Sequence, residues 1–385
     1  MTDRLYYKDA YLTAFDAPVE SVDGVRVRLA QTAFYPTSGG QQFDTGALGG
    51  ARVVDVLDDD AGIVHVLDAA PQFARGASVK GQVDWARRFD HMQQHTGQHL
   101  LSAIFDDLIG AKTASVHFGT DSATLDIETE LVSRKDAVRV EARANAVIAG
   151  NRAVVVSFED AATAQGLRKA NDRTGELRVV SIDGIDRSAC GGTHVRATGE
   201  IGALLIRRLE KYKKLTRIEF VCGARAISRA RADYEALTGI ASALSAGIDE
   251  VPALAASQNE SVRTLESERR KLTEALATYR ARERYDGTAA GPDGVRRIVV
   301  SAAPDELRAL ATAVSALTKA AFIGTCDSPA TVVFAASEDS GLDAGALLKA
   351  ALAANGGRGG GNQKVAQGTA PTVDAINAIV RALTA

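Results

Sequence analysis

The spacing of apolar residues changes at Asp90, and this change limits the folds that the chain can adopt. Before it, short alternating runs such as GVRVRLA and GIVHVLDA are separated by turns rich in Gly, Pro and Asp. This pattern is typical of β-strands, and we expect a small β-barrel or curled sheet over 1–89. After it, apolar residues recur at helical spacing, at Leu100, Leu101, Ile104, Phe105, Leu108 and Ile109. We predict a helix over 91–109, with Asp90 as its N-cap and Gly110 as its C-terminal stop.

Beyond this helix the pattern predicts an α+β fold in several parts. A strand at SATLDI, a helix from about 133 to 149 and a strand at AVVVSF come first, followed by a short helix and two β segments at LRVVSI and ALLIRR. Near the end, strand RRIVVSAA, helix DELRALATAVSALTKA, strand TVVFAAS and helix DAGALLKAALAAN alternate, as in a small α/β domain. We expect a β-barrel-like domain, an α+β domain, a helical connector and a C-terminal α/β domain, over 1–89, 90–224, 225–290 and 291–385.

Apolar residues in the helical connector recur every three or four positions, with Arg269 at one intervening core position. They are Val262, Leu265, Leu272, Leu276 and Tyr279. This repeat is typical of a helical hairpin or a short coiled coil, which would allow a homodimer through the connector and the C-terminal segment. A single amphipathic helix packed on its own chain is the alternative.

Composition places the chain among ordinary globular proteins. Its 385 residues suggest two or three domains, and 46% hydrophobic with 24% charged residues excludes a disordered, collagen-like or disulfide-stapled chain. The three cysteines, Cys190, Cys222 and Cys326, are far apart and odd in number, which favours a reducing compartment. No apolar run approaches the roughly 18 residues of a membrane span, and the first residues lack the apolar core of a signal peptide. We expect a cytoplasmic protein that contacts no membrane.

The net charge is −3, but positive residues are concentrated between 207 and 231, here called the basic segment. Nine Lys or Arg side chains in it are accompanied by only two acidic ones, Glu210 and Glu219. This local excess favours a polyanionic partner, although a solvated basic face would give the same pattern. The candidate contact residues are Arg207, Arg208, Lys211, Lys213, Lys214 and Arg217.

The glycine-rich sequence GGRGGGNQKVAQG is a second candidate surface for phosphate. It is predicted to be a loop, whose backbone amides would act together with Arg358 and Lys364. It lacks the pattern GxxxxGK[ST] of P-loops, which argues against nucleotide hydrolysis. Plain flexibility is the alternative role for this loop.

Two residue pairs could bind one metal ion. His95 and His99 are four residues apart on the predicted helix, which places both imidazoles on one face. Cys190 and His194 have the same spacing in ACGGTHV, where two glycines let the chain turn tightly. Three imidazoles and one thiolate form a tetrahedral set that suits one zinc ion per chain. For the HxxxH pair alone, surface histidines without a metal are the alternative.

Neighbouring residues leave the role of this site open. His91 also lies four residues before His95 and could replace a ligand, although we expect it near the surface as the first helical residue. Asp186 could orient a ligand imidazole or cap a turn. Four protein ligands would close the coordination shell, whereas catalytic zinc usually keeps a position open. The sequence HTGQH lacks the glutamate of HExxH, which argues against peptide hydrolysis by that mechanism.

Five stretches together resemble the editing domain of alanyl-tRNA synthetase and the free-standing alanyl-tRNA editing proteins of the AlaX family. They are FYPTSGGQQFDTG (34–46), RFDHMQQHTGQHLLSA (88–103), DRSACGGTHV (186–195), TGEIGALLI (198–206) and TRIEFVCG (216–223). The segment from about 255 to 385 resembles the C-terminal domain of the synthetase and of the long-form editing proteins. The resemblance implies a zinc-containing editing domain over 90–224. It also implies a hydrolase that deacylates misacylated tRNA-Ala, chiefly the seryl and sometimes the glycyl ester.

The resemblance also implies roles for single residues. Thr37 would recognise the serine hydroxyl, with Gln41 as its neighbour in the same pocket; a turn-stabilising threonine is the alternative. Gly97 replaces a more usual alanine, and we expect little effect from so small a difference. The implied zinc ligands are His95, His99, Cys190 and His194.

A second hydrolytic site has a physical reason, because a binding site for alanine cannot exclude glycine by size and rejects serine only partly. A hydrogen bond to the serine hydroxyl would spare alanine, since alanine leaves the polar group unpaired. The basic segment and the glycine-rich loop would then bind phosphates at the acceptor end of tRNA-Ala. The main alternative is a zinc-structured tRNA-binding module without catalysis of its own. A further one is the editing half of a synthetase that acts with a partner.

Overall fold

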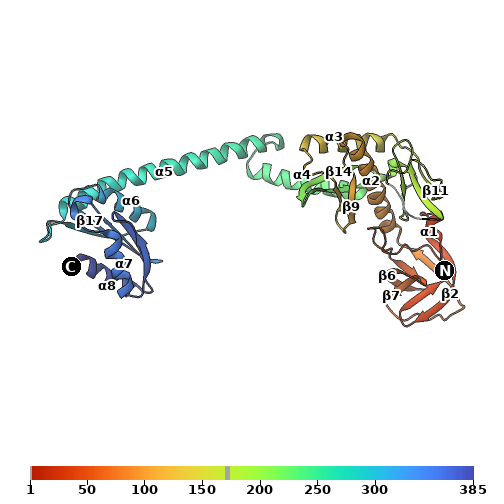
Figure 1. Cartoon of the computed structure of the whole chain (residues 1–385), viewed down its shortest axis with the longest axis horizontal. Helices are drawn as coiled ribbons and strands as arrows, with labels where there is room; N and C mark the ends of the chain where they lie inside the picture. Colours follow the sequence, from red (N-terminus) through yellow and green to blue (C-terminus); the bar gives the residue numbers. More distant parts are fainter. Residues whose placement is uncertain (1, 170–173) are drawn as a thin grey trace. The chain divides into compact units, whose positions relative to one another are not determined.

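The computed structural model describes residues 2–169 and 174–385 (Figure 1). The chain divides into two compact units, Met1–Gly239 and Ile240–Ala385. The mixed α+β class predicted from the sequence is confirmed. The finer division into four segments stays a prediction. Among the described residues, no helix is long and apolar enough to span a membrane.

Six strands in the first part of the chain pair in a closed barrel of order β2-β3-β7-β6-β5-β8, in which β8 pairs again with β2. Alternate residues of β2 and β8 are buried, because successive side chains of a strand lie on opposite faces. The fully buried interior includes Val27, Leu29, Phe34, Leu48 and Ile63. The strands are β2 (Ala14–Asp23), β3 (Arg26–Leu29), β5 (Gly46–Leu48), β6 (Ala51–Asp59), β7 (Gly62–Leu67) and β8 (Ser78–Val83). The short elements beside them are β1 (Asp3–Arg4), α1 (Leu5–Lys8) and β4 (Gln31–Thr32).

Helix α2 (Trp85–Ile109) contains the HTGQH sequence and begins earlier than predicted. Its N-cap is Asp84, whose carboxylate accepts hydrogen bonds from two backbone N–H groups of the first turn. Asp90, the N-cap predicted from the sequence, lies inside the helix and forms an ion pair with Arg225. The first turns of α2, WARRFD, carry charged side chains at positions where an apolar pattern would need hydrophobic ones. The helical spacing of apolar residues therefore identifies only the later turns of the helix. Gly110 ends the helix at a φ of 67°, as predicted.

Two further sheets and two helices complete the first unit. Helix α3 (Arg134–Ala149) agrees with the predicted range, and α4 (Gly223–Ala243) begins in this unit. A four-stranded sheet of order β14-β15-β10-β9 consists of β9 (Thr113–Phe118), β10 (Ala123–Ile127), β14 (Leu204–Tyr212) and β15 (Leu215–Cys222). A three-stranded sheet of order β11-β12-β13 consists of β11 (Val154–Asp160), β12 (Glu176–Ile182) and β13 (Asp186–Ala189). The core that α2 and α3 share with these sheets is buried around Leu100, Phe105, Val140, Val180 and Phe220.

The short helix predicted before LRVVSI is wrong for the described part of that segment. Residues 161–163 form a turn, 164–167 have no regular structure, and 168 and 169 form a bend. The Asp160 carboxylate accepts a hydrogen bond from the Ala162 backbone N–H, and Gly166 adopts a φ of 69°. A side chain that bonds to nearby backbone and a left-handed glycine both favour a turn over a helix. Residues 170–173 lie outside the described residues.

The second unit contains a five-stranded sheet of order β16-β17-β18-β20-β19. The helix predicted to run to about residue 320 ends at Ser315, and a left-handed turn at Lys319 (φ 44°) precedes β17, a strand that the sequence pattern did not predict. The strands are β16 (Arg296–Ser301), β17 (Ala320–Asp327), β18 (Ala330–Ala336), β19 (Arg358–Gly361) and β20 (Val365–Thr369). The helices are α5 (Val251–Gly287), α6 (Pro304–Ser315), α7 (Ala344–Ala354) and α8 (Val373–Thr384).

The glycine-rich sequence predicted to be a loop is a β-hairpin. β19 and β20 pair antiparallel across it. A Cβ atom at Gly359 or Gly361 would lie under 3.0 Å from backbone atoms of β20. The two strands therefore approach each other so closely that these positions require glycine, and the turn-forming composition conceals the strand.

The apolar repeat of the connector lies on one continuous helix, α5, of 37 residues. The buried residues of α5 are Val251 in its first turn and, near its end, Ala277 and Ala281, which lie in the core of the second unit. The repeat itself is exposed, by 49% to 78% per residue. It consists of Val262, Leu265, Leu272, Leu276 and Tyr279.

Candidate metal centre

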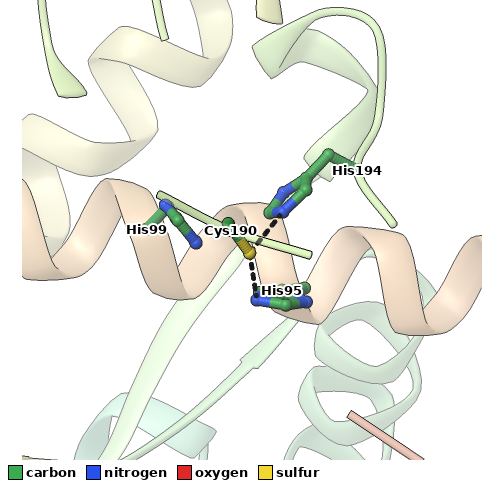
Figure 2. A group of neighbouring side chains, drawn as sticks. All are labelled: His95, His99, Cys190 and His194. Atoms are coloured by element: carbon green, nitrogen blue, oxygen red, sulfur yellow. Dashed lines mark hydrogen bonds between the residues drawn. The ribbon is translucent and has the colours of Figure 1, made fainter. Parts of the chain in front are cut away.

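Four side chains from two distant segments of the first unit meet at one point, here called the metal group (Figure 2). His95 and His99 lie on one face of α2, Cys190 directly follows β13, and His194 lies in the next loop. Their ligand atoms all lie within 4.8 Å of one another. The Cys190 Sγ lies 3.4 Å from His95 Nε2 and 3.3 Å from His194 Nε2. A metal ion could be held at this point.

Each histidine of the metal group forms a hydrogen bond through Nδ1 with a different polar side chain. With Nδ1–H as the donor, Nε2 carries the free electron pair that binds a metal. The four donors, three imidazole nitrogens and one sulfur, therefore fit zinc in chemistry and in number. The pairs are His95 with Gln41 Oε1 (2.9 Å), His99 with Asp186 Oδ2 (2.9 Å) and His194 with Thr96 Oγ1 (3.1 Å).

Asp186 orients an imidazole, one of the two roles considered for it, because its carboxylate bonds to His99. The other carboxylate oxygen accepts from Arg168 Nε at 2.7 Å, and the Ser188 hydroxyl also donates to the carboxylate. Arg168 lies 18 residues earlier in a turn segment, where no sequence pattern marks it. Asp186 is thus held by two partners while it holds the imidazole.

The two glycines after Cys190 allow the chain to pass close to the metal group. A Cβ atom at Gly192 would lie under 3.0 Å from the His95 ring. The Gly192 backbone N–H also points at the Cys190 Sγ, at 3.4 Å. Gly192 is therefore needed for packing at this position, whereas neither Gly191 nor Gly192 adopts a left-handed φ.

Burial and neighbouring charges shift the pKa values of the metal group. Burial alone would raise the pKa of the Cys190 thiol, but the facing imidazoles, above all that of His95, hold it well below its usual value. Burial and the repulsion of His95 lower the pKa of His194 to about 3. Burial also opposes charge on His99, yet the Cys190 thiolate and the Asp186 carboxylate raise its pKa to about 9. The facing imidazoles therefore favour the thiolate, the form of cysteine that binds a metal.

Gly97 lies against Cys222, a contact that the expectation of little effect from an alanine did not include. A Cβ atom at Gly97 would lie under 3.0 Å from the Cys222 Sγ. Cys222 is fully buried, and burial raises the pKa of its thiol. The glycine therefore makes room for this thiol behind the two histidines of α2.

Thr37 and Gln41 lie on the loop over 35–44 but occupy different environments. Thr37 is exposed, and its hydroxyl oxygen accepts a hydrogen bond from the Phe43 backbone N–H at 3.2 Å, as in the turn-stabilising alternative. Gln41 is buried, and besides its contact with His95 its Nε2 donates to Thr193 Oγ1 at 2.8 Å. Gln41 thus positions a ligand imidazole, a contact that the sequence did not indicate.

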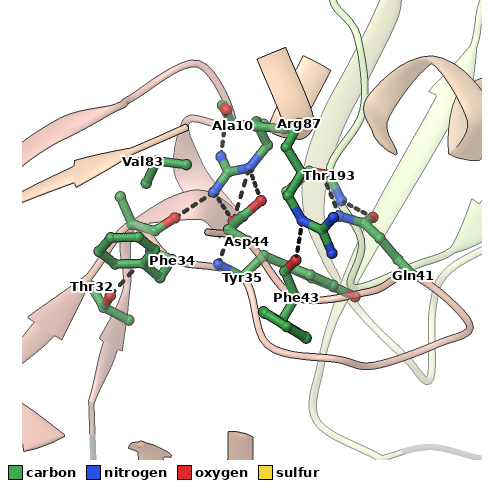
Figure 3. A network of polar contacts seen from close by, with 12 residues as sticks. Ala10, Thr32, Phe34, Tyr35, Gln41, Phe43, Asp44, Val83, Arg87 and Thr193 are labelled. Carbon is green, nitrogen blue, oxygen red and sulfur yellow. Dashed lines mark hydrogen bonds and ion pairs between the residues drawn. The ribbon is translucent and has the colours of Figure 1, made fainter. Parts of the chain in front are cut away.

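An ion pair anchors this loop to the helix that carries the two histidines (Figure 3). Arg88 on α2 and Asp44 at the end of the loop are both fully buried, with Arg88 Nε 3.1 Å from Asp44 Oδ1. Asp44 also accepts the Tyr35 backbone N–H at 2.6 Å, so both ends of the loop are joined. Arg88 donates further to two backbone carbonyls of the first 33 residues. No sequence pattern marks this pair, because its partners are 44 residues apart.

A cavity of about 550 Å³ lies beside the metal group. Among its lining residues are His95, His99 and Cys190. Sequence reasoning missed Gln98, which lines the same cavity although it lies within the HTGQH motif. None of the described lining residues is Asp or Glu. The remaining polar lining includes Tyr7, Tyr35, Ser38, Thr113, Ser115, Arg168, Lys169 and Ser188.

Much of the basic segment is paired with acidic side chains. Lys213 and Lys214, in contrast, lie exposed at the turn between β14 and β15. The pairing reduces the local excess of positive charge on which the predicted polyanion contact depends. The ion pairs are Arg207 and Arg229 with Asp233, Arg208 with Glu210, Lys211 with Glu130, Arg217 with Asp126 and Arg225 with Asp90.

The two basic residues predicted near phosphate in the second unit lie on or beside the hairpin. Arg358 is exposed on β19. Lys364 forms an ion pair with Glu338 at 3.1 Å. Their contact with phosphate stays a prediction.

His91 is buried, contrary to the prediction that it lies near the surface. Because α2 begins at Trp85, His91 lies in its second turn and is only 5% exposed. Burial and the Arg87 guanidinium lower its pKa to about 4. Within the described residues, His91 Nδ1 has no hydrogen-bond partner. It does not belong to the metal group.

Three protein-family models match parts of the chain. Their descriptions are tRNA synthetases class II (A) over residues 8–87, Threonyl and Alanyl tRNA synthetase second additional domain over 177–219, and DHHA1 domain over 294–385. The second range includes Cys190 and His194, and the third includes the glycine-rich hairpin.

Curated proteins match over nearly the whole chain. The alanyl-tRNA editing protein AlaX-L of Pyrococcus horikoshii is 32% identical over 388 residues, which covers 96% of this chain and 94% of that protein. AlaX-M of Methanosarcina mazei is 35% identical over 242 residues, 56% of this chain and 94% of that protein. An alanine–tRNA ligase of Methanoregula boonei is 32% identical over 98% of this chain, which spans 42% of the ligase. Among solved structures, the C-Ala domain of Aquifex aeolicus alanyl-tRNA synthetase matches 25% of this chain and 96% of that chain, with 21% identity and a TM-score of 0.21.

Proposed function

Because the chain belongs to the family of alanyl-tRNA editing proteins, we propose that it is a hydrolase that removes the wrong amino acid from misacylated tRNA-Ala. Ser-tRNA-Ala is the main substrate in this proposal, and Gly-tRNA-Ala is a second one. The two editing proteins described above are each matched over 94% of their own length, which supports the assignment.

One observation carries the proposal: the metal group opens onto a cavity. His95, His99 and Cys190 line about 550 Å³ of space, so a small ester can reach the point where their ligand atoms meet. A structural zinc site has four protein ligands and needs no space beside them for a substrate, whereas a hydrolase needs a cavity that admits its substrate. A tRNA-binding module without catalysis, the alternative, would need no such opening.

Zinc, one per chain, is the metal that we propose. It would be held by His95, His99, Cys190 and His194, whose donor atoms suit it. When bound, zinc supplies a Lewis acid that can polarise an ester carbonyl or place a water molecule.

The chain's own residues orient the ligands and shape the pocket. Gln41 and Asp186 hold two imidazoles with Nε2 turned toward the point of convergence. Water adds to the ester carbonyl, and the ester bond breaks to give the free amino acid and a ribose hydroxyl. In this reaction a proton must pass from the attacking water to the ribose oxygen that leaves. Since none of the described lining residues is a carboxylate, we propose that the neighbouring ribose hydroxyl of the tRNA assists this transfer.

Three of the predicted contact residues are best suited to bind the acceptor end of tRNA-Ala because their side chains are exposed. They are Lys213, Lys214 and Arg358. Residues that form ion pairs within the protein, such as Arg217 with Asp126, must give up the carboxylate before they can bind a phosphate. Removing a side chain that binds a phosphate should make tRNA binding less sensitive to salt. Measuring tRNA affinity against salt concentration for Lys213→Ala and Lys214→Ala tests these two residues.

Two further parts of the proposal concern the state of the protein. The three free cysteines support a reducing compartment, and we place the activity in the cytoplasm. The exposed apolar repeat on α5 supports a homodimer through that helix. Sedimentation at micromolar concentration tests the dimer, and Leu272→Glu, at 70% exposure, should shift the equilibrium to the monomer.

Deacylation of Ser-, Gly- and Ala-tRNA-Ala by the purified chain tests the function directly. We expect rapid loss of the seryl ester, slower loss of the glycyl ester and little loss of the alanyl ester. His95→Ala and Cys190→Ala should abolish the activity together with most of the bound zinc. A zinc-loaded, tRNA-binding chain that leaves Ser-tRNA-Ala intact would favour the non-catalytic module instead.

A further inference from the structure

We propose that Arg178 is a positioning residue for the metal group, because it fixes the backbone of Cys190. This role rests on the metal site of the proposed function. Arg178 lies on β12 and is 8% exposed. The ladder between β12 and β13 ends with the pair Val179 and Ala189, so Arg178 lies opposite Cys190, one position beyond the last pair.

Both peptide groups of Cys190 bond to this one residue. The Cys190 backbone N–H donates to the Arg178 carbonyl oxygen at 3.1 Å. A terminal nitrogen of the Arg178 guanidinium donates in turn to the Cys190 carbonyl oxygen at 2.6 Å. Because peptide groups are planar, these two bonds fix the chain on both sides of the Cys190 Cα atom. Rotation about the Cα–Cβ bond is then the main freedom left to Sγ.

The sequence after Cys190 explains why such support matters. Gly191 and Gly192 have no side chains that could hold the loop, and glycine has more backbone freedom than any other residue. A different backbone conformation at Cys190 would place Sγ differently relative to the imidazoles. The bonds to Arg178 therefore restrict a segment that its own backbone would leave free to move.

A further contact of the guanidinium joins it to helix α1. Arg178 Nε donates to the Tyr7 carbonyl oxygen at 3.1 Å. The guanidinium carbon lies 5.3 Å from the centre of the Tyr7 ring, within reach of a cation–π contact. The Tyr7 hydroxyl lies close to Gly191, since a Cβ atom at this glycine would be 3.3 Å from it. Arg178 and Tyr7 together thus connect α1, β12 and the loop after Cys190.

Arginine suits this role better than lysine. Its planar guanidinium presents several N–H groups in fixed directions, so it can donate to two carbonyl oxygens at once. Lysine would keep the positive charge beside Cys190, but its ammonium group on a flexible chain does not fix two carbonyl groups in one geometry. Replacement of Arg178 by lysine therefore separates the effect of geometry from the effect of charge.

Binding of Co²⁺ to the full chain tests the inference, because the absorption of this metal reports its ligands. A cobalt–thiolate bond gives a charge-transfer band, so the spectrum is sensitive to the position of Sγ. For Arg178→Lys we expect a dissociation constant for Co²⁺ about tenfold higher than that of the wild-type chain, with a weaker charge-transfer band. Arg178→Met removes both side-chain bonds and should raise the constant further, up to about a hundredfold. Far-ultraviolet circular dichroism gives the folded fraction, to which both quantities are referred.

Arg152→Lys is the matched control. The Arg152 guanidinium also donates to a backbone carbonyl, that of Asp183 at 3.1 Å, in the turn between β12 and β13. Arg152 does not belong to the metal group. The same replacement there should leave the affinity for Co²⁺ and the spectrum unchanged. If Arg178→Met folds poorly, Arg178→Lys and this control still decide the question.

Four outcomes have different meanings. Wild-type affinity and spectrum in Arg178→Lys would overturn the inference, because charge alone would then suffice. A loss of folded protein with unchanged affinity in the folded fraction would overturn it as well, since Arg178 would then support only the fold. A wild-type chain that binds no Co²⁺ would overturn the metal site, and this inference with it. A wild-type chain that shows the thiolate band but hydrolyses no Ser-tRNA-Ala would overturn the proposed function alone.

Discussion

Helix α2, which carries two histidines of the metal group, packs closely against its neighbours at Gly97 because glycine has no side-chain carbon. Cys222 occupies the space that a Cβ atom would need, and it is fully buried among core residues. The sequence suggested that alanine and glycine would be interchangeable here, because helix propensity was the only effect visible in it. The contact with Cys222, 125 residues away (222 − 97), is visible only in the fold.

We expect Gly97→Ala to destabilise the chain by about 1–3 kcal/mol, the usual cost of forcing extra volume into a packed core. The roughly 1 kcal/mol that alanine gains over glycine inside a helix offsets part of this cost. The free energy of unfolding in urea measures it. The double variant Gly97→Ala/Cys222→Ala should be more stable than the sum of the two single changes, since the obstructing sulfur is gone. Strictly additive effects would contradict a direct contact.

The spacing of histidine and cysteine predicted which side chains meet, but their polar partners could not be predicted. Gln41 lies 54 residues before His95, and Thr96, although it directly follows His95, bonds to His194 98 residues away. Asp186 was singled out only because it lies four residues before Cys190. Such contacts depend on how the loops fold around the site, which local patterns do not encode.

Asp186→Asn should weaken zinc binding by about ten- to a hundredfold, because the carboxylate that orients His99 loses its charge. Competition with a chelator measures the affinity, and the far-ultraviolet circular dichroism should stay unchanged. Asp183→Asn is the matched control, since Asp183 is an exposed residue nearby outside the metal group. Equal affinities for the two variants would show that Asp186 does not support the ligand.

At the scale of elements, the buried Arg88–Asp44 pair connects helix α2 with the loop over 35–44. Asp44→Asn should cost about 3–5 kcal/mol, since it leaves a buried guanidinium without its counter-charge. The partly exposed pair of Arg28 and Asp59 provides the control, because Asp59→Asn should cost less than about 1 kcal/mol. Thermal and urea unfolding measure both. Similar small losses would mean that the pair does not anchor the loop.

The barrel should lose stability in mild acid through His65 on β7. His65 is fully buried, with Nε2 2.8 Å from Thr32 Oγ1, and burial lowers its pKa to about 4. Above pH ~6.5 the imidazole is neutral in both states. Between pH ~6.5 and ~4 the unfolded chain binds the proton and the folded chain does not, so this group lowers the free energy of unfolding by up to about 3 kcal/mol.

Unfolding curves at pH 7.5, 6 and 5 measure this loss. His65→Gln should make the dependence on pH shallower. His91, whose pKa burial also lowers to about 4, contributes in the same direction, so part of the acid sensitivity should remain in the His65 variant. An unchanged pH dependence in His65→Gln would contradict the assignment.

Element types followed from periodicity where side-chain spacing alone decides them, as in α3, β3 and β7. Element types were not predicted where the close approach of two strands, or a turn of the chain, determines them. The hairpin of β19 and β20 needs glycines that the composition presents as a loop, and β17 follows a turn at Lys319 with little warning in the sequence. The start of α2 was misplaced because charged side chains fill its first turns.

At the scale of the whole molecule, the metal group and its cavity lie within the first compact unit. We therefore expect a chain that ends at Gly247 to keep about one zinc and to hydrolyse a short seryl ester substrate. Its affinity for full-length tRNA-Ala should fall at least about tenfold, because the basic residues of the second unit are removed. Metal analysis, deacylation and a binding titration measure the three properties. Full tRNA affinity in the shortened chain would remove the proposed role of Arg358 and Lys364.

The separation of the two ligand pairs along the chain has a consequence during biosynthesis. His99 leaves the ribosome 91 residues (190 − 99) before Cys190. At roughly 5–20 residues per second, this interval lasts about 5 to 18 seconds. For that time the nascent protein holds two imidazoles without the thiolate, so a complete binding set can form only late in translation. A metal ion that these four side chains could hold would therefore meet the complete set only after β13 has been synthesised.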